Sequence, residues 1–276
     1  MKELSENIDL VSCAFDLTFI RCGSIEKQEA KGEEMSMKKE VMVDMTSGRI
    51  APQILRFAMP VLLGLVFQRI YNFADSYIVG HFLGDNALAA VSVAGVGMYL
   101  VFSLIIGLTT GVTVVMSQYY GAKEEDKVVK TFFSSIFIAL GMTILVTVIG
   151  LLMTRPLLIV LQTPAEVLDA AVLYLRIICA GSVGTMLYNW ISAVLRSLGN
   201  SVVPLIFLGI SSLLNIVFDI LFVAVIPMGV GGAAFATVLA QVISGVACLL
   251  YAWKILPMLR IRRDKLKLDT YIGKQM

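Results

Sequence analysis

Long apolar segments separated by short polar ones constrain this chain more than any other feature. Of its 276 residues, 58% are hydrophobic and 15% are charged, and the mean hydropathy is +0.86. A soluble domain is closer to half apolar and a quarter charged. Six segments reach the ~20 apolar residues that a helix needs to cross a bilayer, at about 54–82, 86–116, 128–153, 167–194, 202–226 and 230–256. The sequence therefore predicts an all-α membrane protein, a bundle of six transmembrane helices.

Lysine and arginine are concentrated in alternate loops, which predicts the orientation of the bundle. The loops on one side of the six spans offer essentially Arg155. Cytoplasmic loops carry the excess of basic residues in membrane proteins, so we expect both termini in the cytoplasm and the protein in the plasma membrane. The basic residues of the cytoplasmic side are Lys38, Lys39, Arg49, Arg56, Lys123, Lys127, Lys130, Arg196, Lys254, Arg260, Arg262, Arg263, Lys265 and Lys267.

Polar segments flank the six spans. Residues 1–45 are mixed in charge and read as a disordered cytoplasmic leader. Met35 and Met37 offer alternative starts, so we interpret residues 1–34 as a candidate over-extension of the reading frame. Residues 46–258 are expected to form the six-helix unit, and residues 259–276 a basic cytoplasmic tail.

Two acidic residues lie inside spans, where a charged side chain costs about 2.5–3.5 kcal/mol on insertion scales. Asp75 is in the first span, and Asp219 closes the stretch PLIFLGISSLLNIVFD of the fifth. Ser212 and Asn215 precede Asp219 at helical spacing, so the three side chains share one face. Because intramembrane acids generally face a cavity or pathway, we expect Asp75 and Asp219 to meet across the bundle and form a cation site.

Further polar side chains follow the same faces and are candidates to line a cavity. They are Gln68, Arg69 and Asn72 in the first span, Ser212 in the fifth and Gln241 in the sixth, where Thr237 and Gln241 are four residues apart. Arg69 is expected either to pair with an intramembrane acid or to lie at a cavity wall. The alternative for these side chains is a purely structural one, in which each hydrogen-bonds neighbouring helices for about 0.6 kcal/mol.

The chemistry of these residues favours ion binding over catalysis. Carboxylate, amide and hydroxyl oxygens suit a hard cation such as Na⁺, and intramembrane acids also carry protons in pumps and transporters. The sequence leaves Na⁺ and H⁺ both open. His81 is the only histidine, so a nucleophile–histidine pair deep in the bundle is excluded. We expect no enzyme activity, no cofactor beyond the coupling ion and no nucleic-acid partner.

Several motifs in order resemble the MATE (multidrug and toxin extrusion) family. They are Thr46-Ser47-Gly48 with ILRFAMPVLLGLVFQRIYNFADSYIVGHFLGDNALAAVSVAG, then MSQYYGAKEEDKV, YLRI, LYNWISAVLRSLGNSVVP, LNIVFDILF and GVGGAAFATVLAQ, over residues 45–256. The resemblance implies a sodium- or proton-coupled antiporter that exports amphipathic or cationic drugs. It also implies a cation site at Asp75, Asn215, Asp219 and Thr237, with Na⁺ as a possible ligand and Asp75 changing partners as the cation binds or leaves.

The resemblance also implies a partner. MATE transporters have two six-helix lobes with substrate between them, and this chain matches the amino-terminal lobe only. We expect a second six-helix lobe, as a missing carboxy-terminal half or as a second copy in a homodimer. Two alternatives stay open: a flippase for lipid-linked precursors from the same superfamily, which would need a more cationic cavity, and a fragment that does not transport.

Overall fold

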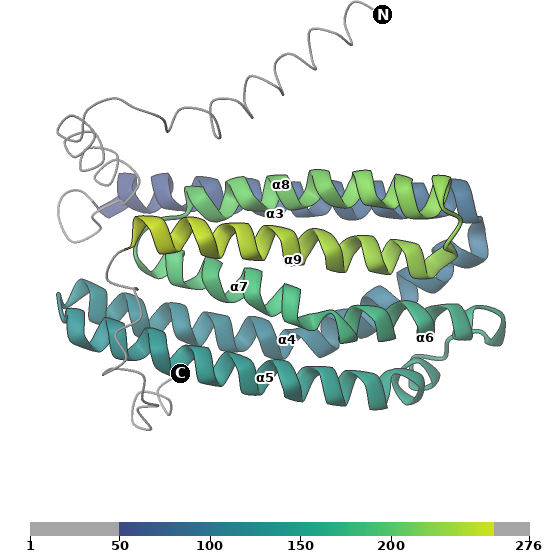
Figure 1. The fold of residues 1–276 in the computed structure, drawn as a ribbon, viewed down its shortest axis with the longest axis horizontal. Helices are drawn as coiled ribbons and strands as arrows, with labels where there is room; N and C mark the ends of the chain where they lie inside the picture. The colour runs from purple at the N-terminus through teal and green to yellow at the C-terminus, as the bar shows by residue number, and fades with distance from the viewer. Residues whose placement is uncertain (1–49, 257–276) are drawn as a thin grey trace, which may run out of the picture. The chain divides into compact units, whose positions relative to one another are not determined.

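The computed structural model describes residues 50–256, so the leader predicted at 1–45 and the tail predicted at 259–276 lie outside the described residues. Within 50–256 every regular element is helical (Figure 1). The elements are α3 (Ile50–Leu83), α4 (Asp85–Gly121), α5 (Glu125–Val160), α6 (Ala165–Ala180), α7 (Ser182–Ser197), α8 (Val202–Asp219), the π-helix η1 (Ile220–Val225) and α9 (Gly229–Ile255). The all-α prediction is confirmed.

Within the described residues, α3, α4, α5, α9 and the continuous segment of α8 with η1 are each long and apolar enough to cross a membrane, and α6 with α7 makes a sixth crossing if the pair is one span. This confirms the six predicted spans, with one difference. The fourth, predicted as one span over about 167–194, is bent by 50° between α6 and α7. The bend lies at Gly181, where a methyl group would be 2.3 Å from Val238 Cγ2 of α9. The bent chain therefore passes α9 at a distance that only glycine allows.

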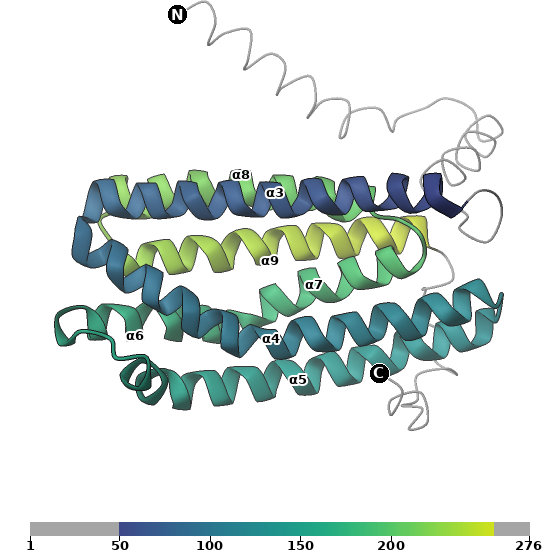
Figure 2. The same cartoon turned by 180° about the vertical axis from the view of Figure 1, so that it is seen from behind.

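The helices of residues 50–256 pack as neighbours that are often distant in sequence (Figures 1 and 2). α3 lies beside α8, α8 beside α9, and α9 beside α7. α4 runs from the end of α3 to the start of α5 and contacts α5, α6 and α7. Gly184 of α7 lies directly against α9, since a methyl group there would be 3.1 Å from the backbone nitrogen of Val242. Small residues let transmembrane helices approach in this way.

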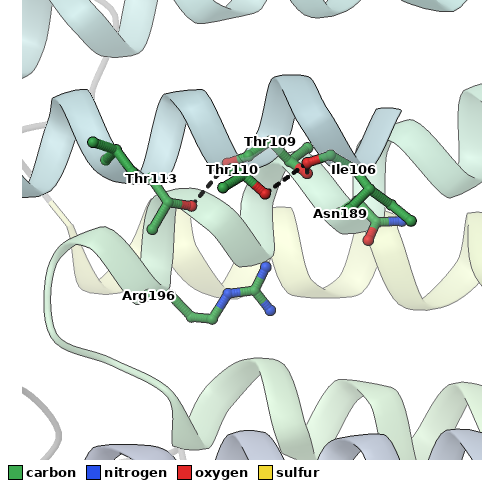
Figure 3. A pocket seen from close by; sticks show the side chains of 7 residues that line it. Ile106, Thr109, Thr110, Thr113, Asn189 and Arg196 are labelled. Atoms are coloured by element: carbon green, nitrogen blue, oxygen red, sulfur yellow. Dashed lines mark hydrogen bonds between the residues drawn. The ribbon is translucent and has the colours of Figure 1, made fainter. Parts of the chain in front are cut away.

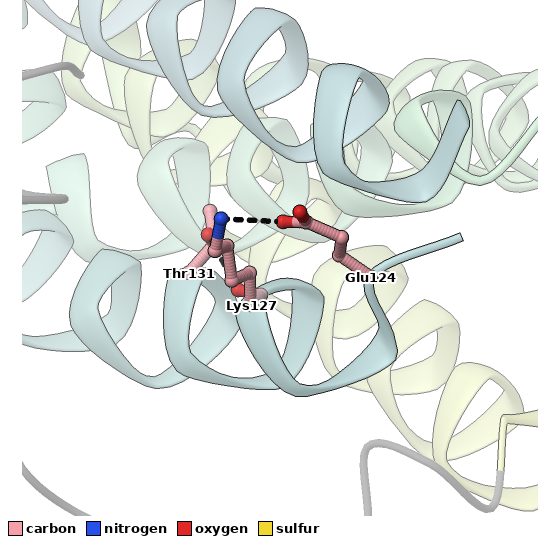
Figure 4. Close-up of polar contacts among 3 residues, drawn as sticks. All are labelled: Glu124, Lys127 and Thr131. Carbon is pink, nitrogen blue, oxygen red and sulfur yellow. Dashed lines mark hydrogen bonds and ion pairs between the residues drawn. The ribbon is translucent and has the colours of Figure 1, made fainter. Parts of the chain in front are cut away.

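The turn between α4 and α5 is held by local polar contacts (Figure 4). Lys127 Nζ lies 2.7 Å from Glu124 Oε2, and the Thr131 hydroxyl donates a hydrogen bond of 2.8 Å to the Lys127 carbonyl. Lys123 in this turn has a φ of +59°, a left-handed conformation that few residues other than glycine adopt. The ion pair is exposed, so it contributes about 0–1 kcal/mol.

The main cluster of buried apolar side chains lies between the end of α3, the start of α4, α6 and the start of α9. Each of the four helices contributes fully buried members, for example Val79, Ala90, Leu175 and Ala233. Large apolar side chains such as those of α3 and α5 are exposed on the outside of the bundle. In a membrane protein these side chains face lipid, and the buried cluster positions the polar site described next.

Candidate cation site

The two intramembrane acids come together where α3 packs against α8. Asp75 is 8% exposed and Asp219 is fully buried. Their carboxyl groups lie close enough to interact directly. Among the described residues, Asp75 Oδ1 and both carboxyl oxygens of Asp219 have no hydrogen-bond partner. Each buried acceptor left without a donor costs about 1–3 kcal/mol, so the pair is a place where a cation or a proton is stabilising.

Asn215 adds a further oxygen one turn before Asp219. It is 3% exposed, and its Nδ2 donates a hydrogen bond of 3.2 Å to Thr237 Oγ1 of α9. The Thr237 hydroxyl in turn donates to the carbonyl of Ala233, also at 3.2 Å. Asn215 Nδ2 and the Thr237 hydroxyl therefore each donate a hydrogen bond within α8 and α9. Asn215 Oδ1, in contrast, has no partner among residues 50–256.

The backbone changes geometry directly after Asp219. α8 ends at this residue and the π-helix η1 follows, with the Ile226 amide donating to the Leu221 carbonyl at 2.8 Å. The wide turn brings the Phe222 carbonyl against α9, where a methyl group on Gly232 would lie 2.8 Å from it. π-helical turns occur frequently at functional sites because they redirect side chains within a helix. Here the turn places Asp219 at the junction of the two geometries.

Two tyrosines that are not among the predicted site residues lie beside the acids. Tyr71 of α3 and Tyr174 of α6 are both within electrostatic range of Asp75 and Asp219. Tyr174 is 4% exposed and its hydroxyl also interacts with Thr237. Tyr71 precedes Asp75 by four residues, a spacing that puts both on one face of a helix and that could have identified it. Tyr174 carries no such signal, because it reaches the site only through tertiary packing.

The remaining predicted residues of α3 lie on the outside of the described bundle. Gln68, Arg69 and Asn72 are all exposed. Gln68 interacts with the Tyr71 hydroxyl, so it is connected to the site through one intermediate. In the part of the chain that the structure describes, Arg69 forms no ion pair with either intramembrane acid, so the expected pairing of Arg69 with an acid is not seen.

Ser212 and Gln241 are both engaged in hydrogen bonds that hold helices. The Ser212 hydroxyl donates to the Leu208 carbonyl of its own helix at 2.9 Å. Gln241 Oε1 accepts a hydrogen bond from the Thr185 hydroxyl, which joins α9 to α7. The geometry of Gln241 corresponds to the structural alternative, in which polar groups hydrogen-bond neighbouring helices, whereas the bond of Ser212 stays within α8.

We expect Thr237→Val to destabilise the bundle by about 1–2 kcal/mol, because Asn215 Nδ2 then loses its acceptor in a buried position. Thermal unfolding of the purified protein measures the change. Thr113→Val is the matched control, since within residues 50–256 the Thr113 hydroxyl bonds only to the carbonyl of Thr109 in its own helix, at 2.8 Å. Equal stability changes in the two variants would contradict a special role for the bond between Asn215 and Thr237.

Comparison with known proteins places this bundle among transporters. The MatE family model matches residues 60–221. The probable multidrug resistance protein YpnP of Bacillus subtilis is 35% identical over 212 residues, which are 76% of this chain and 47% of that protein. The probable multidrug resistance protein NorM of Thermotoga maritima is 28% identical over 196 residues, 70% of this chain and 42% of that protein. The chain spans about half the length of these curated relatives.

Solved structures agree with this assignment. A MOP superfamily transporter from Pyrococcus furiosus is 25% identical with a TM-score of 0.76, over 84% of this chain and 51% of that one. A multidrug resistance MATE family transporter in its outward-facing conformation is 25% identical with a TM-score of 0.74, over 81% of this chain and 49% of that one. The sequence prediction of one MATE-type lobe is thus confirmed. The chain belongs to the MatE family, a family of membrane transporters and not of enzymes.

Proposed function

We propose that this chain is the ion-coupling half of a multidrug efflux antiporter driven by Na⁺ or H⁺. The observation that carries the proposal is the buried pair Asp75 and Asp219, whose carboxyl groups adjoin within the bundle and largely lack hydrogen-bond donors. The relatives named as probable multidrug resistance proteins support drug export as the work that this ion drives, and we propose small amphipathic or cationic molecules as the exported class.

Ion binding at the pair would be coupled to helix position by simple electrostatics. Asp75 is on α3 and Asp219 is at the end of α8, and these two helices lie side by side. A bound cation offsets two adjoining negative charges and holds the helices together. Loss of the cation leaves like charges in a low-dielectric setting, which favours separation of the helices or a new partner for Asp75. Asn215 and Thr237 would supply the neutral oxygens of the site.

A second six-helix unit completes the proposal. Because the chain spans about half of its relatives, we propose that substrate is held between this lobe and either a separate second half or a second copy of the chain. Polar side chains within a membrane span face other protein or a water-filled cavity and not lipid. Gln68, Arg69 and Asn72 of α3 are exposed on this lobe, so we propose that they face the second unit or the cavity beside it. The assembled transporter would lie in the cell membrane with both ends of this chain in the cytoplasm.

Efflux measurements under selective loss of each ion gradient test the proposal. The full chain, expressed in a bacterium that lacks its own drug pumps, is expected to lower accumulation of the cationic dye ethidium. Monensin collapses the Na⁺ gradient and a protonophore collapses the H⁺ gradient. We expect one of the two treatments to abolish export and the other to leave it, so the effective reagent identifies the ion. Crosslinking in the same membranes reports whether a second copy is present.

Persisting export after both gradients collapse would refute ion coupling. If the chain alone exports nothing, coexpression with the second half of a relative such as YpnP must restore the export. Failure of this combination as well would refute the efflux function.

A further inference from the structure

A polar cavity of about 250 Å³ lies between α4 and α7 (Figure 3). Arg196 is in the last turn of α7, just before α8 begins, whereas Asp219 is the last residue of α8. The cavity and the acid pair are therefore near opposite ends of the eighteen residues of α8. The side chains that line it are Ile106, Thr109, Thr110, Thr113, Val114, Asn189 and Arg196.

The positive charge of Arg196 has no counter-charge in the described part of the chain. Its side chain extends from α7 toward the threonines of α4 (Figure 3). The ion pairs found within residues 50–256 join Lys127 to Glu124 and Arg155 to Asp169, and neither involves Arg196. The side chain is only partly exposed. A guanidinium group does not lose its proton in proteins, and withdrawing it from water without a partner is unfavourable. The cavity therefore favours an anion.

The other polar groups around the cavity can also donate hydrogen bonds to a ligand. The Thr110 and Thr113 hydroxyls each donate to a carbonyl four residues earlier in α4, both at 2.8 Å. Each of these carbonyls also accepts a helix N–H bond, so it stays hydrogen-bonded when the hydroxyl turns away. The hydroxyl can therefore rotate to donate to a ligand at little cost. Asn189 Nδ2 uses one hydrogen for the Thr185 carbonyl at 2.8 Å, and its second hydrogen is available.

We propose that this cavity binds a phosphate group through Arg196. A guanidinium fork matches two phosphate oxygens at once, and the hydroxyl and amide donors of α4 and α7 can reach the remaining ones. Ile106 and Val114 add apolar contacts where the cavity opens to the outside of the bundle. The phosphate is either inorganic phosphate or the head group of a membrane phospholipid. This site does not depend on the efflux function.

Binding is tested on the full chain in a neutral detergent, with two pairs of matched probes. Inorganic phosphate is compared with chloride at equal ionic strength, and phosphatidylglycerol with diacylglycerol of the same acyl chains. Thermal unfolding and native mass spectrometry report binding. We expect phosphate, phosphatidylglycerol or both to bind, and Arg196→Gln to weaken that binding about tenfold or more through loss of the charge-assisted bonds. Stabilisation by phosphate that Arg196→Gln loses identifies a free-phosphate site, since phosphate also stabilises folded proteins without binding. Retention of phosphatidylglycerol over diacylglycerol identifies a lipid site.

Two further variants keep the test decisive. Arg176→Gln removes an equal charge from an exposed position on α6 and should leave binding unchanged. Thr110→Val alters an exposed cavity residue, so it should fold, and it is expected to weaken binding severalfold. It therefore serves as the test if Arg196→Gln does not fold. No binding of either phosphate probe, or equal losses in Arg196→Gln and Arg176→Gln, would overturn the proposal.

Discussion

Asp219→Asn is expected to abolish ion-driven export while making the isolated bundle more resistant to heat. The two effects have one cause. Both carboxyl oxygens of Asp219 lie buried without a donor next to Asp75. An amide at this position removes one of two like charges and offers N–H groups to Asp75. The gain in unfolding free energy should be about 1–3 kcal/mol, the usual cost of an unsatisfied buried acceptor. The same change removes the charge that attracts a cation.

The measurement combines thermal unfolding with the response to the coupling ion. Wild-type protein should unfold at a higher temperature when the ion is added, because a ligand that binds only the folded state stabilises it by RT ln(1 + [L]/Kd). The Asp219→Asn variant should start from a higher unfolding temperature and show no ion response. Ethidium export through this variant should fall to the background of cells without the protein.

Asp85→Asn is the matched control for charge. Asp85 is an exposed acid in the first turn of α4, so its replacement should change neither the ion response nor export. Asp75→Asn, like Asp219→Asn, should lose both the ion response and export, since it removes the other carboxylate of the pair. A variant of Asp219 that is less stable than the wild type, or that still exports the dye in response to the ion gradient, would show that the carboxyl has a structural role instead.

The acid pair illustrates how far the sequence predicts this site. Asp75 and Asp219 stand out because carboxylates are rare inside apolar spans, and that cost is a property of each residue alone. Their meeting depends on α3 packing against α8, which periodicity cannot specify. Tyr174 was missed for the same reason, since it belongs to α6 and reaches the acids only because that helix packs near them. Gln68 and Asn72 share the helical spacing of Asp75 yet lie exposed on the described bundle.

The positions of close helix contact were also only partly predictable. Glycines are dense in the second and sixth predicted spans, and small residues of this kind predict close helix packing there. A methyl group at Gly97 or Gly232 would indeed meet a neighbour within 3.0 Å, but at Gly95 and Gly107 it would meet none within 4 Å. The tightest approaches involve Gly181 and Gly184, which belong to the fourth span. Composition identifies small residues, whereas only the rotation of a helix about its axis decides which of them face another helix.

Gly181→Ala is expected to destabilise the bundle by about 1–3 kcal/mol, the usual cost of overpacking a filled contact. The added methyl group would lie 2.3 and 2.4 Å from the two γ-carbons of Val238 and 2.9 Å from its Cβ. Gly181 has a φ of −84°, which alanine adopts freely, so sterics alone cause the loss. Valine is also stiff about χ1 and cannot turn aside. Thermal unfolding in detergent measures the effect, and the bend between α6 and α7 should open.

A double variant separates this contact from a general effect of removing glycine. Val238→Ala in the Gly181→Ala background removes the two shortest contacts and should restore most of the lost stability, with a remainder from the 2.9 Å approach to Cβ. Gly209→Ala in α8 is the control, since nothing lies within 4 Å of the added methyl group. It should stabilise the protein by about 0.5–1 kcal/mol through helix propensity. Equal losses at Gly181 and Gly209, or no recovery in the double variant, would show that the bend does not depend on the packing of α6 and α7 against α9.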